Sequence, residues 1–194
     1  MRKSLSLTVL LCIVTMMLST GCKNKPKDED VRIDTATVVL DMDSIVLRPF
    51  LPWDAMLADL MDHLETNYAG WTNENPDSLT YDVGTGKWKC TLAKGNLKNA
   101  YYFDDAQGNY LKYVSFGYYG SMPLDPLVRE LERNGFIRKG EIVFPGYDAQ
   151  VCYLYLSESG KLEIQLAGWE DGAWVLTFQP TDPNDFKYLV NKTD

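Results

Sequence analysis

Two stretches of the chain carry apolar residues at the three- and four-residue spacing of a helix buried on one side. They are LPWDAMLADLMDHLE, residues 51–65, and MPLDPLVRELERNGF, residues 122–136. In each, the first residue is followed by proline, one apolar residue and aspartate, so Asp54 and Asp125 are predicted to cap the two helices. The helical residues predicted to face the core are Trp53, Met56, Leu57, Leu60, Leu64, Leu127, Val128 and Leu131.

The ends of the second helix are marked by the two residues that most often interrupt helices. Pro126 suits the first helical position, where its missing N–H costs nothing. Gly135 suits the position just after the last turn. The second helix is therefore predicted to end at Gly135.

Apolar and polar residues alternate in the segments that follow each helix, which is the period of half-buried strands. Short glycine-, asparagine- and serine-containing links separate these segments and favour hairpins, because parallel neighbours need crossovers of a dozen or more residues. The predicted strands are SLTYDV, KWKCTLA, NAYYFDD and NYLKYVSFGYY after the first helix, and EIVFPG, AQVCYLYLSE, KLEIQLAG and AWVLTFQP after the second. Two short strands, TATVVL and SIVLRP, are predicted before the first helix.

These elements predict an α+β fold of two tandem units, each with one helix followed by an antiparallel sheet of about four strands. The helices are expected to pack on one sheet face. Residues 51–121 would form the first unit and residues 122–182 the second. Short strands at 35–50 precede them, and a C-terminal tail at 183–194 follows.

The tandem arrangement resembles the beta-lactamase-inhibitor-like and PepSY-like secreted bacterial proteins over residues 51–180. The resemblance rests on the order of elements and on the repeated Pro-x-Asp helix start. It implies a concave, aromatic sheet face that binds another protein. The residues that would form this face are Tyr101, Tyr110, Tyr113, Phe116, Tyr118 and Tyr119. The alternative is that these rings divide between the core and scattered surface positions.

The N-terminus has the pattern of a secretory signal peptide over residues 1–21. Arg2 and Lys3 precede an apolar run at 5–18, which is shorter than the roughly 20 residues of a membrane span. Small residues and then Cys22 follow the run directly. A charged start, a short apolar run and a small-residue site together predict cleavage at this point.

The junction at Cys22 resembles the lipobox of bacterial lipoproteins, in which leucine, two small residues and cysteine mark the cleavage site. Ser19 stands where that family has leucine, and Leu18 lies one position further back. The resemblance implies that Cys22 is lipidated and begins the mature chain. It places the protein on the bacterial outer membrane, on the periplasmic side or at the cell surface. An ordinary secreted protein with Cys22 in a disulfide is the alternative.

A tether is predicted between the lipidated Cys22 and the folded part, over residues 22–34. Residues 23–30 have no large apolar side chain, so they cannot bury enough surface to offset the entropy of ordering. The end of this segment, KDED, resembles the surface-export signal of lipoproteins in some Gram-negative phyla. A plain solvated linker is the alternative.

Charge and cysteine content limit the partners and the redox chemistry. The full chain has a formal charge of −8, and loss of the two signal-peptide cations leaves −10. Such a chain repels phosphate backbones, so nucleic acid is not a predicted partner. Cys90 and Cys152 lie on predicted strands and either pair in an oxidising compartment or remain two buried thiols. No Cys-x-x-Cys motif indicates zinc or thioredoxin chemistry.

One segment, TVVLDMDSIVL, resembles the first motif of haloacid-dehalogenase-type phosphatases. The resemblance implies that Asp41 is a nucleophile and Asp43 a general acid beside magnesium, with Asp104 and Asp105 as the later acidic pair. However, Ser44 stands where that family has glycine, and that fold needs a doubly wound parallel sheet. Aspartates are also favoured at hairpin turns for backbone reasons. A turn between two short strands is therefore the preferred interpretation.

The remaining chemistry gives no catalytic or cofactor motif. His63 is the only histidine, so any triad or nitrogen-rich metal site would need it. It lies near the end of the first helix, where a cation is mildly favoured, and its counterpart in the second helix is Asn134. No P-loop, dinucleotide fingerprint or EF-hand loop occurs, so no cofactor or metal is predicted.

The sequence therefore predicts a lipid-anchored, non-enzymatic binding module of the envelope, with a protein, peptide or glycan partner. Two alternatives stay open. One is an envelope hydrolase or phosphatase that uses Asp41 and Asp43, and the other is a purely structural envelope lipoprotein.

Overall fold

The computed structural model describes residues 38–42, 45–74, 79–143, 148–182 and 189–192. Two helices and twelve strands lie within these ranges. In chain order they are β1 (Leu40–Met42), β2 (Ile45–Leu47), α2 (Leu57–Asn67), β3 (Thr72–Asn73), β4 (Thr80–Asp82), β5 (Lys87–Lys94), β6 (Leu97–Phe103), β7 (Leu111–Tyr118), α3 (Asp125–Arg133), β8 (Ile137–Ile142), β9 (Val151–Leu156), β10 (Leu162–Gly168), β11 (Trp174–Pro180) and β12 (Leu189–Lys192). Neither helix is long and apolar enough to cross a bilayer.

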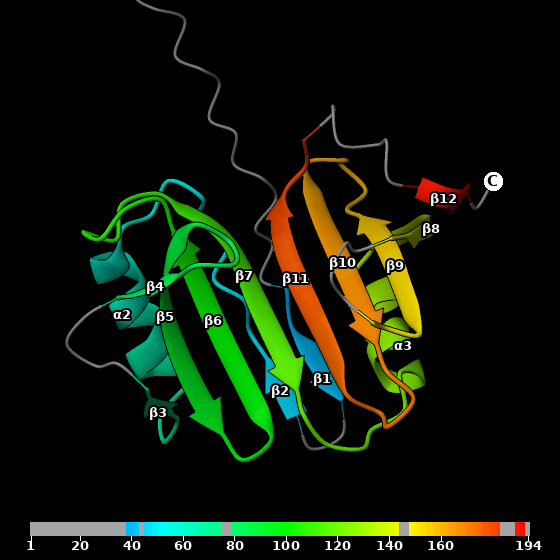
Figure 1. Cartoon of the computed structure of the whole chain (residues 1–194), viewed down its shortest axis with the longest axis horizontal. Helices are drawn as coiled ribbons and strands as arrows, with labels where there is room; N and C mark the ends of the chain where they lie inside the picture. Colours follow the sequence, from blue (N-terminus) through cyan, green and yellow to red (C-terminus); the bar gives the residue numbers. More distant parts are fainter. Residues whose placement is uncertain (1–37, 43–44, 75–78, 144–147, 183–188, 193–194) are drawn as a thin grey trace, which may run out of the picture. The chain divides into compact units, whose positions relative to one another are not determined.

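Ten of the described strands form one antiparallel sheet (Figure 1). Its order is β12-β8-β9-β10-β11-β7-β6-β5-β3, and β4 pairs with the first half of β5. The strands β1 and β2 form a separate two-stranded sheet.

The predicted division into two helix-plus-sheet units is wrong. The last strand before α3, β7, pairs with the last long strand after it, β11, from Tyr118 opposite Trp174 to Val114 opposite Phe178. This pairing joins the strands on both sides of α3 into one sheet. Two separate sheets would leave the backbone groups of β7 and β11 unpaired at two exposed edges, and the observed pairing satisfies them.

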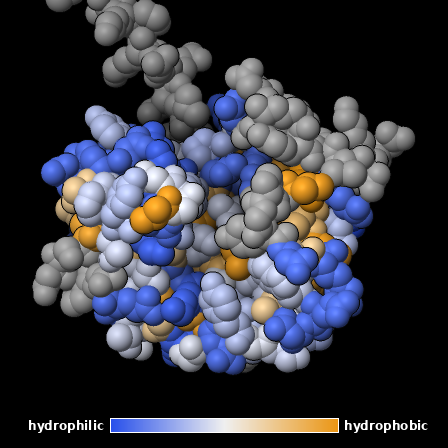
Figure 2. Space-filling view, viewed as in Figure 1, coloured by the Kyte–Doolittle hydropathy of each residue, from blue (hydrophilic) through white to orange (hydrophobic). Residues whose placement is uncertain are grey.

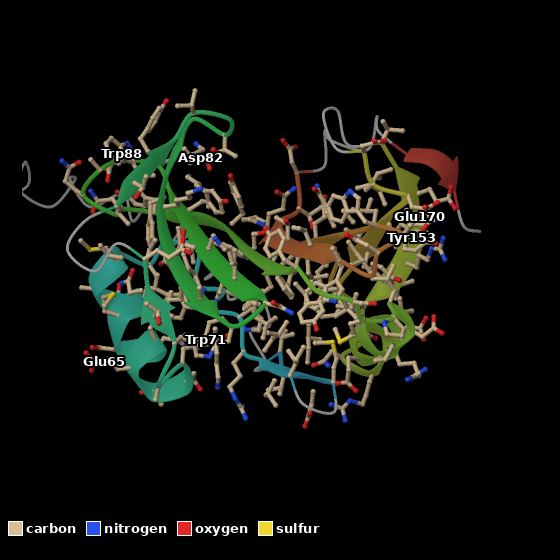
Figure 3. All side chains as sticks on the ribbon, turned by 60° about the horizontal axis from the view of Figure 1, so that its bottom comes forward. Glu65, Trp71, Asp82, Trp88, Tyr153 and Glu170 are labelled. Atoms are coloured by element: carbon tan, nitrogen blue, oxygen red, sulfur yellow. The ribbon has the colours of Figure 1, made fainter. Side chains whose placement is uncertain are left out.

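A second layer covers one face of this sheet. It consists of α2, the β1–β2 hairpin and α3, with the hairpin between the two helices (Figures 1 and 3). The layer and the sheet share one hydrophobic core. Fully or almost fully buried members are Leu40, Leu47, Leu60, Leu64, Tyr101, Phe103, Phe116, Leu127, Leu131, Trp174 and Phe178.

Side chains from the two helices bind the outer edges of the hairpin. The carboxamide of Asn134 accepts from the Val39 N–H at 3.3 Å and donates to the Val39 carbonyl at 2.9 Å. At the other edge, Tyr68 and His63 bind the backbone of Arg48. A two-stranded sheet has two edges with unpaired backbone groups, and here the helices supply partners at both.

The first helix begins differently from the prediction. It starts at Leu57, whose N–H donates to the Gly108 carbonyl at 2.8 Å, so Asp54 is not the cap. Asp59 instead accepts from the Met56 N–H at 2.9 Å. Met56, which was predicted to face the core, is 51% exposed, so the prediction is wrong for this residue.

The second helix agrees with the prediction more closely. It begins at Asp125 with Leu124 as the N-cap, one position earlier than expected. Its end at Gly135 is confirmed, because Gly135 has φ of 80° and its N–H donates to the Glu132 carbonyl at 2.9 Å. The left-handed conformation after the last turn is the one that glycine adopts without strain.

Candidate functional site

The two faces of the ten-stranded sheet have different environments. Successive side chains of a strand point to opposite faces, so each strand contributes to both. One face packs on the second layer. The other, which we call the open face, is not covered by any helix or strand of the described residues (Figure 1). Figure 2 views this face and shows apolar residues scattered among polar ones over its visible part.

Strand register arranges the open-face side chains of five middle strands in two neighbouring rows that cross the strands. Phe178 pairs with Val114, so the next residue of β11 lies opposite Tyr113 on the open face. The first row, called the polar ridge, contains Lys89, Tyr102, Tyr113, Gln179 and Glu163. The second row, called the shallow row, contains Thr91, Ala100, Ser115, Thr177 and Gln165.

Stacked tyrosines form the centre of the polar ridge. The rings of Tyr102 and Tyr113 have centroids 4.1 Å apart and are 19° from parallel. Lys89 Nζ lies 6.0 Å from the Tyr102 centroid and 2.7 Å from Asp82 Oδ2. The hydrogen bond from Lys89 lowers the pKa of Asp82, and the Thr85 N–H adds to this effect. The ridge therefore joins an aromatic stack to a cation whose charge is already paired.

A buried carboxylate organises the other end of the ridge. Glu163 is 6% exposed, and its Oε1 accepts from Gln165 Nε2 at 2.6 Å and from Gln179 Nε2 at 2.8 Å. Only the NH₂ end of a carboxamide can donate to a carboxylate, so these bonds fix which way both amides face. Gln165 and Gln179 are half-buried, and each amide retains its carbonyl and a second N–H for other partners.

Other charges near this face are also paired. Asp104 lies 2.7 Å from Lys87 Nζ and 2.8 Å from Lys112 Nζ. These two ammonium groups, Lys112 first, lower the pKa of Asp104. Lys98 pairs with Glu74 at 3.0 Å. Lys87, Lys89, Lys98 and Lys112 on or beside this face are thus each paired with a carboxylate.

The structure does not bring the six predicted aromatic residues together. Tyr113 and Tyr119 lie on the open face, and the Tyr119 ring covers Gly117 closely enough that a Cβ there would be 2.8 Å from it. Tyr110 is exposed in the loop before β7. The others, Tyr101, Phe116 and Tyr118, point toward the second layer.

Tyr102 and the cluster of Glu163, Gln165 and Gln179 were not predicted from the sequence. A signal for Tyr102 was present, because Lys98, Ala100 and Tyr102 alternate on β6 and a lysine marks the solvent side. No comparable signal existed for Glu163. Its two amide partners come from its own strand and from β11, and only the register brings Gln179 beside it.

The two cysteines on strands lie far apart. Cys90 faces the core from β5, opposite Tyr101, whereas Cys152 lies on β9 opposite Ala167 of the open face. Four strands separate β5 from β9, while a disulfide needs Cα atoms within about 7 Å. The structure therefore does not bring Cys90 and Cys152 together. Burial raises the pKa of the Cys90 thiol to about 11.

The residues of the phosphatase hypothesis are also separated. Asp43 lies outside the described residues, as does the lipidation candidate Cys22. The Asp41 N–H donates to Glu130 of α3 at 3.0 Å, whereas Asp104 is bound by lysines at the end of β6. Within the ranges that the structure describes, no three His, Cys, Asp or Glu side chains are grouped as metal ligands.

Asp105, the second residue of the acidic pair in the phosphatase hypothesis, belongs to a turn. Asp105 Oδ1 accepts from the N–H groups of Gln107 and Asn109, both at 3.0 Å. The bond from Asn109 is the main reason that the pKa of Asp105 is lowered. A short acidic side chain that binds the backbone ahead of it is a common way to close such a loop.

No family model matches this chain. The searches of the curated proteins and of the solved structures also find no match. The open face is therefore interpreted from its own geometry and chemistry.

Proposed function

We propose that this protein is a lipid-anchored, non-enzymatic binding module of the bacterial envelope, and that its open face meets the partner. The observation that carries the proposal is the Tyr102–Tyr113 stack beside the carboxamides that Glu163 holds. These groups lie on interior strands of a ten-stranded sheet, on the face that the second layer does not cover. Tyrosine is well suited to contact surfaces because it offers a large apolar ring and a polar tip.

The position of the open face suits a surface that must remain rigid. Its strands are held by backbone pairing on both sides and by the core beneath them. Side chains on such strands lose little further freedom when a partner binds, so less of the interaction energy is spent on ordering. The Cys22 anchor that the N-terminal pattern predicts would hold the protein at the membrane.

Hydroxyl-radical footprinting tests the proposal without knowledge of the partner. Cells that produce the protein natively and the purified full-length protein in detergent are oxidised in parallel, and tyrosine modification is quantified by mass spectrometry. We expect Tyr102 and Tyr113 to be protected in cells. Tyr110 and Tyr81, which are 59% and 50% exposed, serve as matched tyrosines away from the two rows. Equal oxidation of Tyr102 and Tyr113 in both samples would contradict a partner on the open face.

A further inference from the structure

We infer that Asn134 is a site of spontaneous deamidation that the docked β1–β2 hairpin shields, and that the reaction makes a release of the hairpin permanent. The inference concerns the hairpin edge that α3 binds, and it does not depend on what the open face binds. Three observations carry it: the residue that follows Asn134, the hydrogen bonds of its carboxamide, and the backbone conformation at this position.

Asn134 is the only asparagine of the chain that glycine follows. Deamidation begins when the backbone nitrogen of the following residue attacks Cγ of the asparagine side chain. Glycine favours this attack because it has no Cβ to hinder it and because its backbone rotates freely. Gly135 is also exposed and has open space around its Cβ position, so water can reach the site. The pair therefore has the residues and the solvent access that the reaction needs.

The reaction balances with water as its only co-reactant. The Gly135 nitrogen bonds to Cγ of Asn134, the bond between Cγ and Nδ2 breaks, and ammonia leaves with the proton of the Gly135 nitrogen. Water then opens the cyclic imide at one of its two carbonyls, which gives aspartate or isoaspartate. Either product has a free carboxylate in place of the carboxamide. One negative charge is gained, and both side-chain N–H donors are lost.

The folded conformation opposes the attack. The ψ of 9° at Asn134 places the Gly135 nitrogen beside the backbone nitrogen of Asn134 and away from its Cβ, so the ring cannot close. The Gly135 N–H is also bound to the Glu132 carbonyl at 2.9 Å. The carboxamide is fixed as well, because Nδ2 donates to the Val39 carbonyl at 2.9 Å and to the Glu130 carbonyl at 2.8 Å. Asn134 must therefore leave these partners before it reacts.

The hairpin supplies the partners that come from outside α3. Val39 exchanges two hydrogen bonds with the Asn134 carboxamide, and Asp41 donates its N–H to Glu130 Oε2 at 3.0 Å. Within the described residues β1 pairs with β2 alone, so no backbone pairing to the ten-stranded sheet holds this edge (Figure 1). Strand ends open locally at lower cost than the interior of a sheet. Opening of the hairpin at Val39 therefore frees the carboxamide while the large sheet stays folded.

After the reaction the hairpin cannot return to the same hydrogen bonds. A carboxylate only accepts, so at position 134 it would face the Val39 and Glu130 carbonyls with no proton between them. The new charge also lies at the C-terminal end of α3, where the helix dipole disfavours an anion. The docked conformation of the hairpin edge is thereby destabilised, and a transient opening becomes permanent.

The first test measures deamidation of full-length protein in detergent, with and without urea, at mildly alkaline pH. Peptide mass spectrometry quantifies the product at each asparagine, and a methyltransferase specific for isoaspartate confirms the imide route. In urea we expect Asn134 to react faster than every other asparagine. In the native protein its rate should be at least tenfold lower, because the carboxamide and the Gly135 N–H are both bound.

Three variants test the role of the hairpin. Glu130→Ala removes the acceptor of the Asp41 N–H but keeps the backbone carbonyl that binds Asn134, so the native rate should rise at least threefold. Arg133→Ala is the matched control, because Arg133 binds the same Glu130 oxygen at 2.6 Å, and the rate should not change. Asn134→Asp carries one product from the start. Its Val39 and Asp41 amides should exchange with deuterium at least tenfold faster than in wild type, while the amides of β6 keep the wild-type rate and so show that the sheet is folded.

Each part of the inference can fail separately. A slow reaction of Asn134 in urea would remove the site, and equal rates in native protein and in urea would remove the shielding. Equal native rates for Glu130→Ala and Arg133→Ala would show that the hairpin is not the shield. Unchanged exchange at Val39 in Asn134→Asp would show that the carboxylate does not prevent docking. None of these results bears on the protection of Tyr102 and Tyr113 in cells, so the proposed function is decided by its own experiment.

Discussion

The hydroxyl of Tyr68 makes two hydrogen bonds to the backbone of Arg48. It accepts from the Arg48 N–H at 2.9 Å and donates to the Arg48 carbonyl at 2.8 Å. Tyr68 is the C-cap of α2, and Arg48 directly follows β2. Burial raises the pKa of Tyr68 to about 12, so the hydroxyl keeps its proton at any physiological pH. One side chain therefore fixes the end of the hairpin to the end of the helix.

Replacing Tyr68 by phenylalanine should destabilise the protein. The variant keeps the ring but removes both hydrogen bonds, and it leaves a partly buried backbone N–H and carbonyl at Arg48 without that partner. Buried polar groups that lose a partner cost about 1–3 kcal/mol. We expect a loss of this size in the free energy of unfolding, measured by urea denaturation with an unchanged m-value.

The matched control is Tyr155→Phe. Tyr155 is fully buried, and its hydroxyl has no hydrogen-bond partner among the described residues. The same chemical change should therefore be neutral or stabilising there, because it removes an unsatisfied polar group. Equal losses for Tyr68→Phe and Tyr155→Phe would show that ring packing, and not the bonds to Arg48, explains the effect.

Stability should fall in mildly acidic solution because of His63. Its Nε2 lies 2.9 Å from the Arg48 carbonyl. Burial lowers the pKa of His63, and the bond to Arg48 opposes this only partly. The unfolded chain then binds the proton more readily than the folded chain. The stabilisation is fully present above about pH 6.5 and is lost as the pH falls through the lowered pKa.

The variant His63→Asn tests this linkage. Because His63 is the only histidine, little else in the chain titrates between pH 5.5 and 7.5. Asparagine is also the residue that binds the other edge of the hairpin, at Asn134. We expect the slope of unfolding free energy against pH in this range to disappear in the variant. A variant that keeps the wild-type slope would assign the pH dependence to another group.

The candidate site shows what the alternation of residues along a strand can and cannot predict. Alternation puts Tyr101 and Phe103 on one face of β6 and Tyr102 with Lys98 on the other, but it does not say which residues of the neighbouring strands lie beside them. The register settles this, since Tyr101 is opposite Cys90 and Tyr102 is opposite Lys89. Alternation is local, whereas the contents of a face depend on pairing between distant segments.

The fold shows the same limit. Helix and hairpin signals lie within short windows, so α2, α3 and most strands could be found from the sequence. The pairing of Phe116 with Leu176 joins residues far apart in the chain and decides whether one sheet or two sheets form. No local signal carries that choice. Likewise, the start of α2 depends on a carbonyl from Gly108, which no window around Leu57 contains.

Gly108 should be intolerant of any side chain. Its φ is 74°, and a Cβ at this position would lie 2.5 Å from Leu57 Cβ at the first residue of α2. Gly108→Ala therefore combines backbone strain of about 1 kcal/mol with a clash at the helix start. Gly160→Ala is the control, because Gly160 has φ of 69° and open space around its Cβ position. We expect a drop in Tm for both variants and a clearly larger drop for Gly108→Ala; equal drops would argue against the clash.

The Cys90 thiol should be almost inert in the folded protein. Burial raises its pKa to about 11, so about one thiol in a thousand is ionised at pH 8, and the thiolate is the reactive form. Native-state labelling with iodoacetamide at pH 8, followed by peptide mass spectrometry, should leave Cys90 unmodified until denaturant is added. Cys152, which is half-buried on another strand, provides the internal comparison. Rapid modification of Cys90 in the native state would show that β5 opens more readily than its packing indicates.

Lipidation at Cys22 can be tested independently of the folded part. Cells grown with radiolabelled palmitate should incorporate label into the wild-type protein and not into Cys22→Ala, because the thiol is the acceptor of the lipid. A single acyl chain binds membranes only marginally and several hold a protein firmly, so wild type should sediment with membranes and the variant should not. Cys90→Ala controls for loss of a cysteine and should behave as wild type in both assays. Label retained in Cys22→Ala would place the lipid elsewhere, and an unlabelled wild-type protein would remove the anchor from the proposed function while leaving the open face to be tested on its own.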